Sequence, residues 1–289
     1  MLNETATRFA RASFKLKLVA GLLFFQVAEG FFGGSNRRCY HTVGCFIKGD
    51  NLTLPYRFPS SPESVGTKFN LYSRQHKEKP VEISESLPKE TLNSYFGTKK
   101  DLVFIVHGFG QGEHSTMPIE MKDAFLEKID CNFVIVLWTR GARKPLYNIA
   151  AANTALVGRQ IALLLRKLTE EFPETVLSPE VHLIGFSLGA HAAGFCGRYF
   201  TLITNKTIGR ITDIGCSHRR SAEYFVESLT NRNCKFVSYS CTNGLQDRVS
   251  ACKINQSDHS VMGYYSKDAL GRGAQMLPTK SRSPYCERW

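Results

Sequence analysis

Four short apolar runs constrain the fold of this chain more than any other feature. They occupy residues 101–109, 132–138 and 180–186, with a weaker run at 208–213. Between the second and third runs, over residues 148–172, apolar side chains recur at the spacing of an amphipathic helix. A further helix is predicted over residues 189–200. Apolar strands that alternate with helices predict an α/β fold with a mostly parallel central sheet flanked by helices.

The first thirty residues have the features of a secretory signal peptide. Basic residues between Arg8 and Lys17 precede an apolar stretch at 18–28, and Ala28 and Gly30 provide a small-x-small cleavage site. The apolar stretch is short for a bilayer span, although an uncleaved anchor is the alternative interpretation. We therefore expect residues 1–30 to be removed and residues 31–289 to form one exported domain. Glycosylation sequons begin at Asn51, Asn205 and Asn255.

Composition excludes several classes of protein. Hydrophobic residues make up 43% of the chain, which argues against disorder. The net charge of +12 comes from 37 basic and 25 acidic residues. We interpret it as a solvated basic surface, with attraction to anionic lipid or glycosaminoglycan as the alternative. Metal-ligand spacings, a phosphate-binding loop and aromatic residues among the basic ones are all missing from the sequence, so no metal, cofactor or nucleic acid is expected.

A nucleophile motif follows the third apolar run. The sequence Gly185-Phe186-Ser187-Leu188-Gly189 fits G-x-S-x-G, with a predicted strand before it and a predicted helix after it. This is the context that a nucleophile elbow requires, because a sharp turn presents the serine at the carboxyl end of a strand. The alternative is a serine that only caps a helix. The motif predicts Ser187 as the nucleophile of a serine hydrolase.

A second motif supports the first. His107-Gly108-Phe109 ends the first apolar run. A strand that ends in H-G-x can turn a backbone N–H group toward the nucleophile. The amides of Phe109 and Leu188 are therefore predicted to form the oxyanion hole.

The base and the acid of a serine hydrolase of this type follow the nucleophile in the chain. Three histidines follow Ser187. His191 lies four residues along the same predicted helix and is interpreted as structural, and His259 lies in a polar stretch, so His218 is the predicted base. Asp213 is the one carboxylate between Ser187 and His218. It is the candidate acid, and a plain strand-end or turn aspartate is the equally open alternative.

Taken together, the motifs resemble the catalytic domain of the pancreatic-type (animal) triacylglycerol lipase family. The resemblance spans about residues 39–286. It rests on Cys39-Tyr-His-Thr-Val-Gly-Cys45-Phe46, Pro62-Glu63, Leu71-Tyr72, His107-Gly-Phe, Val157-Gly158, Gly185-Phe-Ser-Leu-Gly-Ala-His191, Ile208-Gly-Arg-Ile-Thr212, Cys216-Ser-His218, Met262-Gly263-Tyr264 and Pro284-Tyr-Cys286. The resemblance implies an α/β-hydrolase fold. It also implies Ser187 as nucleophile, His218 as its histidine partner, and Phe109 and Leu188 as the oxyanion amides.

The chain departs from the family pattern after Thr212. The family continues I-T with G-L-D-P, whereas this chain reads Ile211-Thr212-Asp213-Ile214-Gly215-Cys216. Several tens of residues that the family places next are missing, and they would hold the acid, a calcium site, later strands and the lid. We therefore expect a sheet truncated near its C-terminal strands, and Asp213 does not align with the family acid. We also expect no C-terminal β-sandwich domain of the kind that the family has.

Nine cysteines are an odd number. The resemblance implies the pairs Cys39–Cys45 and Cys241–Cys252, and more weakly Cys234–Cys286. Cys131 and Cys196 remain as a possible pair, which leaves Cys216 unpaired because its family partner lies in the missing segment.

The resemblance implies a secreted serine carboxylic-ester hydrolase acting on a triacylglycerol or on the sn-1 acyl ester of a phospholipid. Transient contact with a lipid interface is part of that expectation, and no oligomeric state follows from the sequence. Loss of the family acid leaves open a lipase-like lipid-binding protein with weak or no turnover. A chain that does not fold stably is the third possibility, because a missing strand exposes a sheet edge.

Overall fold

The computed structural model describes residues 35–214, 219–241, 254–270 and 275–286, with backbone alone at 219, 241 and 254–258. From Asn36 onward the described residues belong to one compact unit. The predicted signal peptide, residues 1–30, lies outside the described residues. The strands are β1 Arg37–Tyr40, β2 Gly44–Ile47, β3 Lys68–Ser73, β4 His76–Ile83, β5 Asp101–Val106, β6 Cys131–Leu137, β7 Val181–Phe186, β8 Arg210–Ile214, β9 Val237–Cys241, β10 Ile254–Val261 and β11 Gln275–Met276. The helices are α1 Pro62–Val65, α2 Lys89–Phe96, α3 Thr116–Lys128, α4 Tyr147–Glu171, α5 Leu188–Thr204 and α6 Arg219–Thr230, with 3₁₀ turns η1 Ser178–Glu180 and η3 Tyr264–Asp268.

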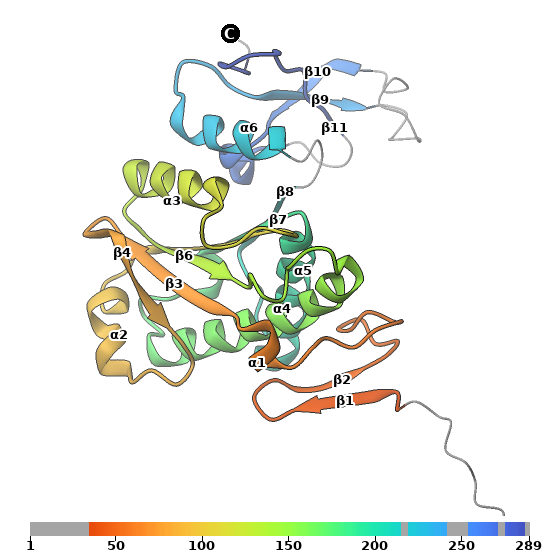
Figure 1. Ribbon diagram of the computed structural model, residues 1–289. Helices are drawn as coiled ribbons and strands as arrows, with labels where there is room; N and C mark the ends of the chain where they lie inside the picture. The colour runs from red at the N-terminus through yellow and green to blue at the C-terminus, as the bar shows by residue number, and fades with distance from the viewer. Residues whose placement is uncertain (1–34, 215–218, 242–253, 271–274, 287–289) are drawn as a thin grey trace, which may run out of the picture. The chain divides into compact units, whose positions relative to one another are not determined.

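Six strands form one mixed sheet in the order β4-β3-β6-β5-β7-β8 (Figure 1). The four strands β6, β5, β7 and β8 run parallel. They correspond to the four predicted apolar runs, and β6 and β7 are buried along their whole length. A strand covered on both faces needs apolar residues at every position, which is why these runs were visible in the sequence.

Two further strands extend the sheet on the β6 side. The loop-rich, polar region before residue 101 contains β3, antiparallel to β6, and β4, antiparallel to β3. In β3 the side chains of Phe69 and Leu71 are buried, whereas β4 reads HKEKPVEI and is largely exposed. A solvent-facing edge strand can carry Lys, Glu and Pro80, because one of its faces and one of its edges remain in water.

The opposite edge of the sheet is β8. Among the described strands β8 pairs with β7 alone, and β9, β10 and β11 form a separate antiparallel sheet. The central sheet thus ends, within the described residues, at the strand where the sequence departs from the family pattern. The truncation near the C-terminal strands stays a prediction.

Helices cover the two faces of the sheet. Phe104 of β5 packs in one hydrophobic cluster with Leu156 of α4 and Phe200 of α5. The neighbouring Val103 and Ile105 point to the other face, into a second cluster with α3 and α6. The long helix predicted over residues 148–172 is α4, Tyr147–Glu171, and it is buried along most of its length.

The cysteines follow the resemblance in part. Disulfides join Cys39 to Cys45 and Cys234 to Cys286, as predicted. The suggested pair Cys131–Cys196 is wrong, because both thiols are free and buried. Cys131 lies in the α3 and α6 cluster and Cys196 lies in the α4 and α5 cluster, so the sheet separates them. Cys216, Cys252 and the side chain of Cys241 lie outside the described residues.

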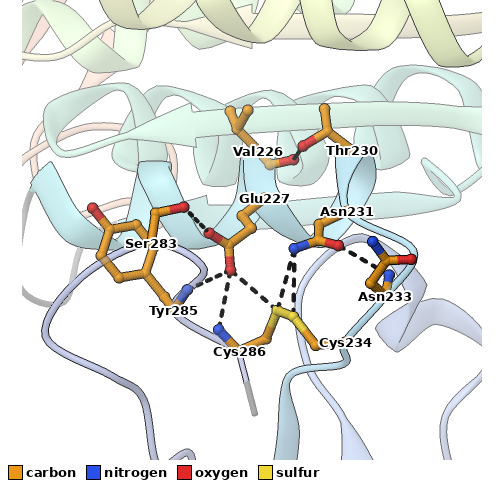
Figure 2. Close-up of a disulfide and its surroundings, with 9 residues drawn as sticks. All are labelled: Val226, Glu227, Thr230, Asn231, Asn233, Cys234, Ser283, Tyr285 and Cys286. Atoms are coloured by element: carbon orange, nitrogen blue, oxygen red, sulfur yellow. Dashed lines mark hydrogen bonds between the residues drawn. A yellow bond between two sulfur atoms is a disulfide. The ribbon is translucent and has the colours of Figure 1, made fainter. Parts of the chain in front are cut away.

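A buried carboxylate holds the C-terminal segment against α6 (Figure 2). Glu227 Oε1 accepts hydrogen bonds from the backbone N–H groups of Tyr285 at 2.7 Å and Cys286 at 3.0 Å. Its Oε2 accepts one from the Ser283 hydroxyl at 2.8 Å. Glu227 also lies beside the Cys234–Cys286 disulfide. Because both sulfurs are bonded to each other, neither offers a thiolate, and this cluster is a structural clamp rather than a metal site.

No helix among the described residues is long and apolar enough to cross a membrane.

Candidate active site

Ser187 occupies a strained turn between β7 and α5. Its backbone has φ 54° and ψ −120°, and only one other described non-glycine residue, Asn205, has a positive φ. The turn is held because the Ser187 N–H group donates to the Ile214 carbonyl at 3.2 Å and its carbonyl accepts from Ala190 at 2.9 Å. Strain of this kind costs about 1–3 kcal/mol and persists where a site requires it. The turn is the elbow that the G-x-S-x-G motif predicts.

The two glycines of the motif allow this turn to pack closely. A Cβ atom on Gly189 would lie 2.0 Å from the carbonyl oxygen of Val106 in β5. A Cβ atom on Gly185 would lie 2.4 Å from the Cα atom of Ala190. Both contacts are with backbone, which cannot move aside as a flexible side chain can. The elbow therefore sits directly on the end of β5.

The loop after β5 carries the predicted oxyanion amide. A Cβ atom on Gly108 would lie 2.9 Å from Ser187 Cβ, so this loop lies against the nucleophile. Phe109 follows Gly108, and Leu188 is the first residue of α5, where backbone N–H groups project beyond the helix end. The structure thus places Phe109, next to Gly108, and Leu188, next to Ser187, in the two segments that meet at the elbow. That their amides form an oxyanion hole stays a prediction.

His107 supports this loop from inside the protein, and the sequence reasoning assigned it no separate role. Its ring is fully buried and stacks on Trp138 with ring centroids 5.6 Å apart. The Trp138 backbone N–H group donates to His107 Nε2 at 3.0 Å, and His107 Nδ1 lies 3.0 Å from the Gly108 carbonyl. Because Nε2 accepts, Nδ1 carries the hydrogen and donates to that carbonyl. The position of His107 immediately before Gly108-Phe109 was the available signal.

The Gly108 carbonyl and the Phe109 N–H group belong to the same planar peptide unit. A hydrogen bond that fixes the carbonyl therefore also fixes the direction of the N–H group. Burial lowers the pKa of His107 to about 4, so the ring stays neutral and keeps this arrangement at neutral pH. His107 therefore orients the peptide unit that carries the Phe109 N–H group, the predicted oxyanion amide.

Replacing His107 by glutamine is expected to lower kcat for a soluble ester by about 10- to 100-fold. This loss is smaller than the loss expected when an oxyanion donor is removed completely. Glutamine can replace the acceptor at Nε2 but not the donor at Nδ1, whereas asparagine can replace the donor. The His107→Asn variant should therefore retain more activity than His107→Gln, with KM little changed in either. Steady-state kinetics between pH 6 and 8 test this, and equal kcat values for the two variants would contradict the positioning role.

Asp213 lies on β8, the strand next to β7, at a level that β7 reaches before the elbow. Its Cα atom is level with Gly185 in the β7–β8 register, two residues before Ser187 along the sheet, and its side chain is exposed. The predicted base, His218, lies outside the described residues. His191 is exposed in the first turns of α5.

Comparison with known proteins adds a family to this geometry. Residues 37–215 match the family model described as Lipase, which is more than half of the chain. The chain belongs to the lipase family. Membership and the sheet topology together confirm the α/β-hydrolase fold, with a mixed central sheet flanked by helices.

The curated relatives include pancreatic enzymes. Pancreatic lipase-related protein 2 of Rattus norvegicus is 38% identical over 189 residues, covering 63% of this chain and 38% of that protein. Pancreatic triacylglycerol lipase of Equus caballus is 36% identical over 187 residues, covering 62% and 38%. Inactive pancreatic lipase-related protein 1 of Homo sapiens is 33% identical over 185 residues, covering 61% and 38%. The matched part of the chain thus spans less than two fifths of these relatives.

Proposed function

We propose that this chain is a secreted serine carboxylic-ester hydrolase that acts on lipids. The strained turn at Ser187, pressed against the oxyanion loop, is the observation that carries the proposal. Ser187 Oγ attacks the acyl carbon while His218 takes its proton, and the amides of Phe109 and Leu188 hold the oxyanion. His218 then returns the proton to the leaving alcohol, and water hydrolyses the acyl-enzyme.

The relatives named as triacylglycerol lipases support a lipid ester as substrate. Triacylglycerol and the sn-1 ester of a phospholipid are the two candidates. Assays on triolein, phosphatidylcholine and a short soluble ester separate them. A triacylglycerol lipase hydrolyses triolein in preference to phosphatidylcholine, a phospholipase has the opposite preference, and both hydrolyse the short ester. Release of fatty acid from none of the three by the purified, folded chain would contradict the proposal.

Asp213 is the candidate acid, and its position argues for a small contribution. A step of two residues along a strand separates the levels of its carboxylate and of Ser187 by roughly 6–7 Å, and the carboxylate is exposed. Replacing Asp213 with asparagine is therefore expected to lower kcat by less than about tenfold, against the roughly 10⁴-fold effect of disabling a triad acid. Kinetics on the soluble ester measure the difference. A loss near 10⁴-fold would instead make Asp213 the working acid.

A lipid-binding protein with weak or no turnover is the second candidate. The exposure of Asp213 favours it, as does the similarity to a relative named inactive. Such a protein needs only a lipid-binding surface. Lipid that purifies with the chain, together with no ester turnover by the parent chain, would support this function over catalysis.

Secretion is supported by features at several places in the chain. The basic and apolar residues of the first thirty positions precede sequons at Asn51 and Asn205, whose side chains are exposed. Asn255 belongs to the third sequon, and its side chain lies outside the described part of the chain. Expression in cultured animal cells tests this, with recovery from the medium, an amino terminus near residue 31 and a mobility shift on deglycosylation as the expected results.

A further inference from the structure

An exposed segment with apolar and basic side chains lies between β6 and α4. Every residue from Arg143 to Asn148 is exposed. Leu146 and Tyr147 are large hydrophobic side chains that are 49% and 51% accessible to solvent. Single exposed hydrophobic side chains are common, but two large ones side by side are candidates for a contact surface.

This segment borders the candidate active site. The backbone N–H group of Gly110, in the oxyanion loop, donates to the Ala142 carbonyl at 2.8 Å. The rings of Phe109 and Tyr147 pack edge to face with centroids 5.2 Å apart. Because Phe109 follows the glycine that touches Ser187, the exposed segment lies at the rim of the site.

The charge of the segment has one sign. Residues 139–148 contain Arg140, Arg143 and Lys144 and no carboxylate. The Arg140 guanidinium donates to the Glu63 carbonyl, a neutral acceptor, so its charge is not cancelled there. The whole chain has a net charge of +12, which adds to the local excess. Exposed cations beside exposed apolar side chains complement a surface of anionic headgroups over acyl chains.

We propose that the segment from Arg143 to Tyr147 docks this chain on an anionic lipid surface. Leu146 and Tyr147 enter the boundary between headgroups and acyl chains, while Arg143 and Lys144 pair with the headgroup anions. The docked segment brings the rim of the Ser187 site to the surface from which a lipid ester would enter. The apolar pair favours a lipid surface over an anionic polysaccharide, which would engage the cations alone. The docking proposal rests on the proposed function only for the purpose that docking would serve, because binding to a lipid surface needs no catalysis.

Vesicle co-sedimentation tests the docking surface. The full chain recovered from the culture medium is mixed with phosphatidylcholine vesicles, with or without phosphatidylglycerol, at low and high salt. Leu146→Ser should lower the partition coefficient about tenfold on both vesicles, because one leucine is no longer buried. Arg143→Gln should lower it about fivefold on the anionic vesicles alone, and high salt should remove that difference.

A matched control removes one exposed leucine and one exposed cation far from the segment. Leu202 is 66% exposed near the end of α5, and Lys206 is exposed just beyond it. Leu202 is the fourteenth residue after Leu188 in α5, which places it about 21 Å farther along the helix. The double variant Leu202→Ser/Lys206→Gln loses one leucine and one charge, as Leu146→Ser/Arg143→Gln does, and keeps the Asn205 sequon. The control should bind vesicles within about twofold of the parent chain, whereas the rim variant should lose about fiftyfold on anionic vesicles.

Three results would overturn the inference. The first is a parent chain that does not bind anionic vesicles, and the second is an equal loss of vesicle binding in the two double variants. The third is a rim variant, Leu146→Ser/Arg143→Gln, that is no longer retained on a heparin column but binds vesicles as the parent does. The last would assign the cations to a polysaccharide. Hydrolysis of the soluble ester is measured in parallel and should be unchanged in the rim variant. A chain that binds vesicles through this segment but hydrolyses no ester would contradict the proposed activity and leave the docking surface supported.

Discussion

Replacing Ser187 with alanine is expected to remove ester hydrolysis, because it deletes the oxygen that attacks the acyl carbon. In a complete triad this substitution costs about 10⁶-fold in kcat. When the acid contributes little, the kcat of the parent enzyme is already roughly 10⁴-fold lower. The loss of kcat expected for Ser187→Ala in this chain is therefore at least about 10²-fold. Burst and steady-state kinetics on a short soluble ester measure it. Turnover that survives in Ser187→Ala at the parent level would place the activity elsewhere.

A glycine at the same position provides the control for folding. Because Ser187 is held at φ 54°, Ser187→Gly relieves backbone strain while it also removes the nucleophile. Relief of about 1–3 kcal/mol, less the backbone entropy that glycine loses on folding, should raise the free energy of unfolding by about 1 kcal/mol. An inactive variant that is more stable than the parent would show that the strain serves the site. Equal or lower stability would show that the turn imposes no strain.

Replacing Gly189 with alanine is expected to destabilise the fold by about 3 kcal/mol. The new Cβ atom would lie 2.0 Å from the Val106 carbonyl oxygen, so the start of α5 would have to move away from β5. Overpacking against backbone costs more than overpacking against a flexible side chain. The same movement separates the elbow from the oxyanion loop, so ester turnover should fall as well. Chemical denaturation of both proteins measures the change in the free energy of unfolding.

A second glycine of α5 provides the control for Gly189→Ala. Gly194 is an interior residue of α5, and a Cβ atom there would have no neighbour within 4 Å. Gly194→Ala should therefore stabilise the chain by about 0.5–1 kcal/mol, through helix propensity alone. If Gly189→Ala were as stable as Gly194→Ala, the close contact between the elbow and β5 would not exist.

The parts of the fold that the sequence predicted share one property. The strands β5, β6 and β7 are buried and carry apolar side chains at most positions, and the largely buried helix α4 carries apolar side chains at helical spacing. The elbow was equally visible, because the G-x-S-x-G motif is a short run of sequence between a predicted strand and a predicted helix. Both signals are written within short stretches of sequence, even where the contact behind them, such as that of Gly189 with Val106, is remote.

What only the tertiary structure decided depends on contacts between distant segments. The polar edge strand β4 forms because β3, which itself pairs with the remote strand β6, offers it hydrogen bonds, not because its own residues favour a strand. Cys131 and Cys196 stay apart because a sheet lies between them, which no count of cysteines reveals. His107 gains its role from Trp138, 31 residues later, through a hydrogen bond that fixes the tautomer. The sequence alone determined which residue is the candidate nucleophile and which fold holds it. The three-dimensional packing determined how the peptide of the predicted oxyanion amide is oriented, because orientation depends on partners that are remote in the chain.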